Sequence, residues 1–444
     1  MTPQPPETAP SAEEPEHHQE PPTVQALTEP RDGVPRVIAT AAGLQRAAEA
    51  LASGTGPASI DAERASGFRY GQRAFLVQIR REAAGTWLID PEPFDDLKVI
   101  DDALSGVEWI LHAASQDLPC LAELGMWPDQ LFDTELAARL AGLPRVGLAA
   151  VVENLLGLGL AKEHSAVDWS TRPLPQSWLG YAALDVEVLG EVRDALRNIL
   201  EAEGKLGFAV EEFEAIVNAG VPEPRADPWR RTSGLHQLRE RRKLEAVRRL
   251  WLARDRLASN RDVAPGRLIP DSAIVAAAKA MPATVPALLS TSGFHGRAAK
   301  REAPRWLRCI DGARRATTLP PMHLPSTSPP PPRVWADRDP AAAARLATTR
   351  NRLGTMAEEL HMPVENLLTP DTLRRIAWQP PAALTASAVA ADLAERGARR
   401  WQRELVADVI AEAFNHPDPL PEKSPGKQQQ DKLQRQDRQQ QRNQ

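Results

Sequence analysis

Apolar and polar positions divide the chain into a region with alternating strand and helix patterns and a region that is helical throughout. From residue 36 to 220, short apolar runs typical of strands come first, and segments with apolar residues at helical spacing follow or intervene. Strands are expected at 34–38, 58–62, 74–80, 86–90 and 108–112, and helices near 40–51, 95–104, 116–125, 133–141, 147–157 and 177–204. This order predicts an α/β domain in which helices cover a mixed sheet.

Beyond Pro222 the apolar spacing is helical and predicts two all-α modules, at 225–315 and 339–415. The intervening segment, 316–338, is rich in proline, and we expect an extended linker there. The modules share weak self-similarity, which suggests a duplication: RDRL at 254–257 matches RNRL at 350–353, and LIPDS at 268–272 matches LTPDT at 368–372.

Both ends of the chain are poor in large apolar residues. Residues 1–35 are rich in Pro and Glu, and residues 416–444 are rich in Gln. Such segments cannot bury enough apolar surface to offset the entropy lost on folding, so both are predicted to be disordered.

The overall composition is that of a soluble globular protein, with 42% hydrophobic and 25% charged residues among 444. No apolar run reaches the roughly 18 residues of a membrane span, and the N-terminus lacks the basic and apolar regions of a signal peptide. The two cysteines, Cys120 and Cys309, make neither a disulfide framework nor a zinc site. We therefore expect a cytoplasmic protein with no membrane partner, and a monomer is favoured although the sequence does not determine the oligomeric state.

The net charge of −5 conceals an uneven distribution of charge. Residues 1–35 have a net charge of −6 and residues 36–220 a net charge of −13, whereas residues 221–444 have a net charge of +14. An acidic half joined to a basic half makes nucleic acid the leading candidate partner of the basic half. Two solvated surfaces of opposite sign remain the alternative.

Four carboxylates and a phenol are predicted to meet in the α/β domain. Asp61 and Glu63 share one face of a strand because they are two residues apart. Asp117 opens the helix that follows the strand at 108–112, and Tyr181 and Asp185 lie one helical turn apart. Hard divalent ions such as Mg²⁺ and Mn²⁺ prefer such oxygen ligands, and a pair of them can hydrolyse phosphodiesters. Alternatively, Asp117 only stabilises its helix dipole and Tyr181 is an ordinary half-buried aromatic residue.

These residues and their flanks resemble the three exonuclease motifs of the ribonuclease D family, in the tyrosine branch of the DEDD 3′–5′ exonucleases. The motifs are Asp61-Ala62-Glu63, His112 through Asp117, and Tyr181 through Asp185; further similar segments are FLVQI at 75–79, FDT at 132–134, DWSTRPL at 168–174 and QS at 176–177. The resemblance covers residues 36–220. Ala62 replaces a common Thr and Arg64 a common apolar residue, and both changes bear on substrate contacts.

The resemblance implies a ribonuclease H-like exonuclease domain that releases nucleoside 5′-monophosphates from 3′ ends. In this interpretation Asp61, Glu63, Asp117 and Asp185 ligate two divalent metal ions, Mg²⁺ or Mn²⁺, and Tyr181 orients the attacking water. Three residues are candidates for contacts with the substrate: Gln78, His112 and Arg172. For two of these a structural alternative stays open, because His112 can simply close a strand and Arg172 can be an ion-pair partner.

The basic half contains a second resemblance. Residues 225–256 contain 11 basic and four acidic residues, and bases spread over several helical turns can follow a phosphate backbone. Leu235-x-x-Leu238-Arg239, Leu268–Asp271 and Leu288-Leu289 resemble the HRDC domain, a helical nucleic-acid-binding module. The candidate contacts are Arg239, Arg241, Arg242 and Lys243, with a solvated helix face as the alternative. The module at 339–415 resembles a divergent HRDC repeat, and the role of its Arg399–Arg403 cluster stays open.

Together these features predict a metal-dependent 3′–5′ exoribonuclease that processes tRNA precursors and other structured RNA. A DNA-directed 3′–5′ exonuclease remains a rival because a two-metal site acts on phosphate, and sugar discrimination needs a contact to the 2′-OH. A non-catalytic nucleic-acid-binding scaffold is the third possibility, and the intact carboxylate set argues against it.

Overall fold

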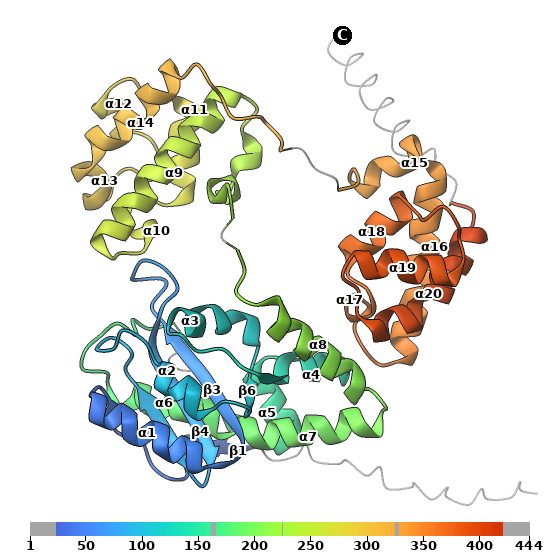
Figure 1. The fold of residues 1–444 in the computed structure, drawn as a ribbon. Coiled ribbons are helices and arrows are strands. Elements are labelled where there is room, and N and C mark those ends of the chain that lie inside the picture. Colours follow the sequence, from blue (N-terminus) through green and yellow to red (C-terminus); the bar gives the residue numbers. More distant parts are fainter. Residues whose placement is uncertain (1–23, 161–165, 224, 325–327, 421–444) are drawn as a thin grey trace, which may run out of the picture.

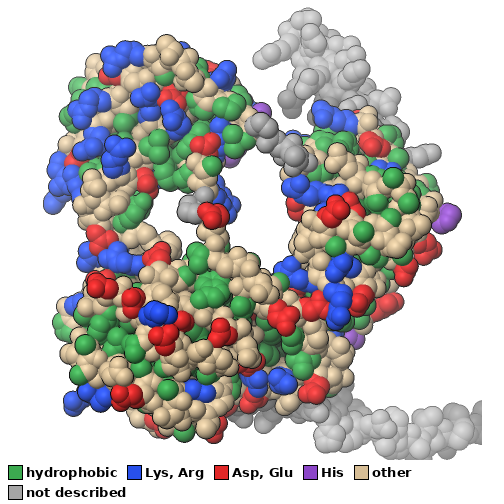
Figure 2. Space-filling model, in the orientation of Figure 1, with side chains coloured by type: hydrophobic (Ala, Val, Ile, Leu, Met, Phe, Trp, Pro, Cys, Tyr) green, Lys and Arg blue, Asp and Glu red, His purple; other side chains and the backbone are tan. Residues whose placement is uncertain are grey.

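The computed structural model describes residues 24–160, 166–223, 225–324 and 328–420, which form three domains around an opening (Figures 1 and 2). We call them the α/β domain (24–220), the first helical domain (225–315) and the second helical domain (328–420). None of the described helices has the length and apolar character that a membrane span requires.

A six-stranded mixed sheet forms the centre of the α/β domain. Its strands are β2 (Val37–Ile38), β3 (Thr55–Arg64), β4 (Ala74–Glu82), β5 (Gly85–Ile89), β6 (Glu108–Leu111) and β7 (Gln130–Asp133), in the order β2-β5-β4-β3-β6-β7. The pairs β3–β4 and β4–β5 are antiparallel, and the pairs β2–β5, β3–β6 and β6–β7 are parallel. The predicted mixed sheet is confirmed, and β3 lies in its interior.

Helices flank this sheet. They are α1 (Ala41–Ser53), α2 (Lys98–Ala103), η1 (Ala114–Gln116), α3 (Leu118–Glu123), α4 (Thr134–Leu140), α5 (Leu148–Leu156), α6 (Gln176–Glu187), α7 (Leu189–Ala202) and α8 (Leu206–Ala219). The α1 helix begins as predicted, because the Thr40 hydroxyl accepts a hydrogen bond from the Gly43 amide at 3.2 Å. Its buried stripe includes Leu44 and Leu51. The helix predicted over 177–204 is two helices, α6 and α7, divided at Val188.

Disorder of the N-terminal segment was predicted up to residue 35, and this is wrong for residues 24–35. Strand β1 (Gln25–Leu27) pairs in parallel with β8 (Leu158–Leu160). The backbone amide of Arg31 donates to the buried Glu187 carboxylate, and its guanidinium pairs with Glu191. Backbone pairing and ion pairs order this segment, and neither requires large apolar side chains. Residues 1–23 lie outside the described residues.

Both helical domains are all-α, as predicted. The first contains η2 (Pro228–Arg231), η3 (Leu235–Gln237), α9 (Arg241–Arg261), α10 (Pro265–Leu268), α11 (Asp271–Ala280), α12 (Val285–Leu289), α13 (Arg297–Arg301) and α14 (Ala303–Arg315). The second contains η4 (Pro332–Val334), α15 (Trp335–Arg338), α16 (Pro340–Glu359), α17 (Val364–Leu367), α18 (Pro370–Trp378), α19 (Ala386–Glu395) and α20 (Arg400–Asn415).

The boundaries of the second helical domain differ from the prediction. The expected linker, 316–338, includes η4 and α15 at its end, because Trp335 is fully buried and packs against Trp378 with ring centroids 4.9 Å apart. At the other end, the Asp418 amide donates to the Thr348 hydroxyl at 2.7 Å, so the described residues of the predicted tail still contact the domain. Residues 421–444 lie outside the described residues.

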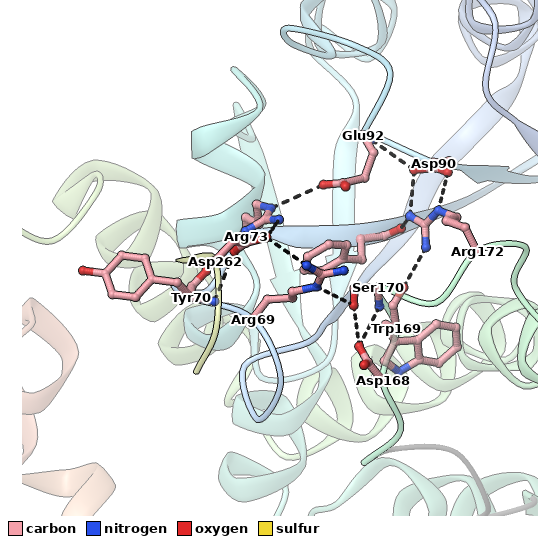
Figure 3. A network of polar contacts seen from close by, with 11 residues as sticks. Arg69, Tyr70, Arg73, Asp90, Glu92, Asp168, Trp169, Ser170, Arg172 and Asp262 are labelled. Carbon is pink, nitrogen blue, oxygen red and sulfur yellow. Dashed lines mark hydrogen bonds and ion pairs between the residues drawn. The ribbon is translucent and has the colours of Figure 1, made fainter. Parts of the chain in front are cut away.

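Asp262 lies at the centre of a contact between the first helical domain and the α/β domain. The loop between β3 and β4 presents Arg69, Tyr70 and Arg73 to Asp262, which ends α9 (Figure 3). Asp262 accepts two hydrogen bonds from Arg73, both at 2.9 Å, and one each from Arg69 and the Tyr70 amide, both at 3.3 Å. The Tyr70 hydroxyl also donates to Asp255 at 3.1 Å. This loop leaves the strand that carries Asp61 and Glu63, so it links the first helical domain to the candidate site.

The second helical domain packs on α8 of the α/β domain through α20. Trp401 is buried, stacks on Phe208 with centroids 4.6 Å apart, and donates from its indole nitrogen to Glu212 at 3.2 Å. Arg399 and Arg400 pair with Glu212 and Glu211, each at 3.3 Å. The Arg399–Arg403 cluster, whose role the sequence left open, is thus part of an interface between domains.

Candidate active site

Three of the four predicted carboxylates converge where β3 meets α6. Asp61 and Glu63 project from β3, and Asp185 projects from α6, which packs against β3 and β4. Each of the three offers an oxygen within 4.8 Å of the oxygens of the other two. The structure therefore brings together residues more than 120 positions apart in the chain, as the sequence predicts.

Asp117 lies at the edge of this cluster and is not one of the three mutually close carboxylates. Its Oδ1 is 3.1 Å from Nη2 of Arg64. The turn before Asp117 is held by Asp133, which accepts hydrogen bonds from the amides of Ala113 and Ala114 at 3.1 and 2.9 Å. Asp133 is thus a positioning residue that the sequence analysis missed, although its FDT segment was noted.

Tyr181 lies one turn before Asp185 on α6 and hydrogen-bonds to its carboxylate. Burial raises the pKa of the Tyr181 phenol, and the charges of Asp185 and Glu63 raise it further. The phenol therefore stays protonated at neutral pH, so it can donate one hydrogen bond and accept another.

The cluster is electrostatically strained because its carboxylates are buried close together. Burial raises the pKa of Asp117 above its ordinary value and the charge of Asp61 adds to the shift, whereas the positive charge of Arg64 opposes it. Burial also raises the pKa values of Glu63 and Asp185 well above their ordinary values, again with a contribution from Asp61. A divalent cation would relieve this repulsion, and the all-oxygen donor set suits Mg²⁺ or Mn²⁺. The residues therefore fit a divalent metal.

Gln78, predicted to contact substrate, instead supports the carboxylates. It lies opposite Asp61 in the β3–β4 pairing and is fully buried. Its Nε2 donates to Oδ2 of Asp61 at 3.3 Å. Its position beneath the cluster orients Asp61 and leaves no surface for nucleic acid.

His112 and Arg172 both have partners within the protein, as the structural alternative for each of them expects. The His112 ring shares a 2.9 Å hydrogen bond with the Thr134 hydroxyl, and burial lowers its pKa to about 4. Arg172 forms a bidentate pair with Asp90 at 2.7 and 2.8 Å and donates its remaining N–H groups to backbone carbonyls (Figure 3). Arg172 therefore joins the 168–174 segment to the sheet and has no donor left for a phosphate.

A groove of about 410 Å³ lies beside the carboxylates. Its walls come from the end of β3, the β3–β4 loop and the segment before α6. The lining residues are Ala62, Glu63, Arg64, Ser66, Gly67, Phe68, Gln72, Gln116, Ala166 and Val167. Glu63 is the one of the four predicted carboxylates that lines this groove.

On the first helical domain, three of the four candidate nucleic-acid contacts have internal partners. Arg241 donates to the carbonyl of Pro320 at 3.0 Å, and Arg242 donates to the Ala313 carbonyl at 2.8 Å at the end of α14. Lys243 pairs with Glu240 at 2.6 Å. Arg239 is exposed and has no partner among the described residues.

A basic groove of about 430 Å³ lies between α9 and α14, and the sequence analysis did not single it out. Its lining residues are Arg248, Arg249, Leu252, Ala253, Arg256, Arg305, Arg308 and Cys309. Arg249 and Arg256 are seven residues apart on α9, and Arg305 and Arg308 are three apart on α14, spacings that place each pair on one helical face. Figure 2 shows Lys and Arg side chains over this domain at the upper left.

Comparison with known families identifies related domains in each of the three parts of the chain. Residues 35–201 match the family of 3′–5′ exonucleases, residues 243–310 match the HRDC domain, and residues 328–414 match the C-terminal domain of 3′–5′ exonucleases. A ribonuclease D from Granulibacter bethesdensis is 32% identical over 61% of this chain and 67% of its own. The chain belongs to the ribonuclease D family. A Shewanella ribonuclease D is 35% identical, over 46% of this chain and 53% of the relative.

Solved structures extend the similarity beyond the α/β domain. A protein from Bifidobacterium adolescentis is 40% identical with a TM-score of 0.80, covering 88% of this chain and all of that one. Escherichia coli RNase D is 25% identical with a TM-score of 0.63, covering 86% of this chain and 99% of that one. The similarity to both structures therefore extends over most of the three domains of this chain.

Proposed function

We propose that this protein is a metal-dependent 3′–5′ exoribonuclease that trims the 3′ ends of structured RNA, tRNA precursors among them, and releases nucleoside 5′-monophosphates. The observation that carries the proposal is the convergence of Asp61, Glu63 and Asp185 within 4.8 Å beside an open groove. E. coli RNase D is described as an exoribonuclease involved in structured RNA processing, and its similarity supports the same substrate class here.

In this proposal, Asp61, Glu63, Asp117 and Asp185 hold two divalent ions, Mg²⁺ or Mn²⁺. Bound there, such ions would activate a water and stabilise the departing oxygen. The Tyr181 phenol, which hydrogen-bonds to Asp185, would orient the attacking water and thereby favour in-line attack on the terminal phosphodiester.

The first helical domain binds the body of the RNA in this proposal. Arg256 and Arg308 line the basic groove, are exposed and have no partner among the described residues. Arginines without an internal partner can neutralise phosphates and release counterions. Of the four residues on this domain that the sequence predicts to contact nucleic acid, Arg239 stays a candidate for a phosphate contact.

The test is degradation of a tRNA precursor with a 3′ extension, with and without Mg²⁺. We expect Asp61→Asn and Asp185→Asn to reduce trimming to background and Tyr181→Phe to slow it by about 10²–10⁴-fold. Arg80→Ala on β4, which breaks an ion pair with Asp32, is the matched control and should trim normally. Wild-type trimming by Asp185→Asn in a folded protein would refute the proposal.

Matched RNA and DNA 3′ overhangs separate the proposal from its rival. We expect faster trimming of RNA, and equal or faster trimming of DNA would instead identify a DNA-directed exonuclease. Binding of RNA without Mn²⁺ binding by calorimetry would identify a non-catalytic scaffold.

A further inference from the structure

Arg64 directly contacts one of the predicted metal ligands, Asp117. Arg64 is the last residue of β3, and its Nη2 lies 3.1 Å from Oδ1 of Asp117. Its Nη1 donates to the carbonyl of Gln116, so both ends of the guanidinium contact the turn that presents Asp117. The ion pair is partly buried, with side-chain exposures of 25% for Arg64 and 7% for Asp117.

The local backbone explains how Arg64 reaches this turn. Neighbouring residues on a regular strand point to opposite faces, so Arg64 would face away from Glu63. The β3–β4 pairing changes register between Glu63 and Arg64. Such an irregularity re-aims the side chain that follows it. The arginine is thereby directed to the side of the sheet where the carboxylates lie.

Arg64 contacts the carboxylate of Asp117, which in the proposed function is a metal ligand. Three carboxylates lie within 4.8 Å of one another, whereas the fourth, Asp117, is held by the guanidinium. A guanidinium and a divalent ion cannot both take the same carboxylate oxygen at close range, because like charges repel. Arg64 also lines the 410 Å³ groove, which gives a displaced side chain room to move.

We propose that Arg64 is a built-in counter-ion that occupies Asp117 until a divalent cation displaces it, and that it thereby weakens metal binding on the Asp117 side of the site. The proposal rests on metal binding by the carboxylates and goes beyond it by naming the residue that sets the affinity. The ion pair stabilises the metal-free protein, and this stability is given up when metal binds.

Calorimetric titration of the full chain with Mn²⁺, at constant pH and ionic strength, tests the proposal. We expect Arg64→Ala to tighten Mn²⁺ binding on the order of tenfold and to lower the melting temperature of the protein in EDTA. Arg64→Gln keeps the aliphatic stem and should show the same changes if Arg64→Ala folds poorly. Unchanged or weaker Mn²⁺ binding by a folded variant would overturn the proposal.

A double-mutant cycle with Asp117→Asn separates the ion pair from a general effect of charge. Without the Asp117 carboxylate, Arg64→Ala should no longer tighten Mn²⁺ binding at the remaining carboxylates, and equal tightening in both backgrounds would contradict the competition. Arg80→Ala removes an arginine from β4 and should leave the affinity unchanged. If the wild-type protein binds no Mn²⁺, the proposed function itself fails, whereas normal binding that does not respond to Arg64 refutes only this inference.

Discussion

The two helical domains repeat one arrangement of helices but differ sharply in charge. Helices α9, α10 and α11 have 21, 4 and 10 residues, and α16, α17 and α18 have 20, 4 and 9. Leu250 and Leu257 of α9 match the equally buried Leu346 and Leu353 of α16. Residues 225–315, however, carry 21 basic and eight acidic residues, whereas residues 316–415 carry 11 of each. The excess positive charge of the C-terminal half therefore belongs to the first helical domain.

The domains also differ in what their arginines contact. In the first, Arg256 and Arg308 line an open groove and lack partners among the described residues. In the second, Arg399 and Arg400 pair with Glu212 and Glu211 of α8. The same scaffold thus leaves arginines exposed in a groove in one domain and uses arginines for an internal interface in the other. A cluster of arginines identifies a nucleic-acid surface only where no acidic element of the same chain covers it.

The largest expected effect concerns the docking of the second helical domain. Trp401→Ala removes a buried ring that stacks on Phe208 and hydrogen-bonds to Glu212. We expect a loss of roughly 3–5 kcal/mol in the stability of this interface. Hydrogen exchange of α8 and α20 should then rise together, while exchange in α9 and α14 stays unchanged. Unaltered exchange in α8 would show that the domains dock by other contacts.

The next effect concerns the basic groove of the first helical domain. Arg256→Ala combined with Arg308→Ala should weaken RNA binding about tenfold, or by about 1.4 kcal/mol, because two phosphate contacts are lost. The slope of log K against the logarithm of the salt concentration, where K is the RNA-binding constant, should fall in magnitude by about 2. Arg350→Ala on α16 also removes an exposed arginine and is the control in the other domain. An equal loss of binding with Arg350→Ala would abolish the distinction between the two domains.

A smaller effect is expected where the first helical domain meets the α/β domain. Asp262→Ala removes the shared acceptor of Arg69 and Arg73, which are partly exposed, so the cost should be roughly 1 kcal/mol. Small-angle scattering should detect a wider range of positions of the first helical domain. Cleavage of a dinucleotide, which depends mainly on the carboxylates of the α/β domain, should be unchanged. A large loss of dinucleotide cleavage would mean that Asp262 also supports the active site.

The smallest expected effect is a pH dependence of the docking of the second helical domain on the α/β domain. Burial raises the pKa of Glu212 above its ordinary value of 4.5, and this outweighs the opposing charge of Arg399. The pKa of Glu212 is higher when the second helical domain is docked than when it is not. The contribution of Glu212 to docking is therefore fully present below pH 4.5, and it is lost as the pH rises through the pKa of the docked state. Glu212→Gln should remove this dependence from the exchange of α20. The lining residues of the basic groove include no carboxylate, so RNA binding there should lack this pH dependence.

Local patterns predicted much of the fold and the centre of the site. The apolar stripe of α1, its Thr40 cap and the face shared by Asp61 and Glu63 each depend on residues within a few positions of one another. The functions of Gln78, His112 and Arg172 could not be predicted in this way. Their partners, Asp61, Thr134 and Asp90, lie 17, 22 and 82 positions away, and only the folded sheet brings them into contact.

The sequence by itself determined the three-part organisation, the mixed sheet, the carboxylates that converge and the split between an acidic and a basic half. Periodicity, capping and the spacing of side chains on a strand or a helix are local properties, so they can be read along the chain. Only the tertiary structure decided which charged side chains of the described residues form ion pairs with each other and which do not. Arg64 on Asp117, Arg399 on Glu212 and Asp262 beside Arg73 are pairings across 53, 187 and 189 positions, and Coulomb interactions depend on distance in space rather than along the sequence.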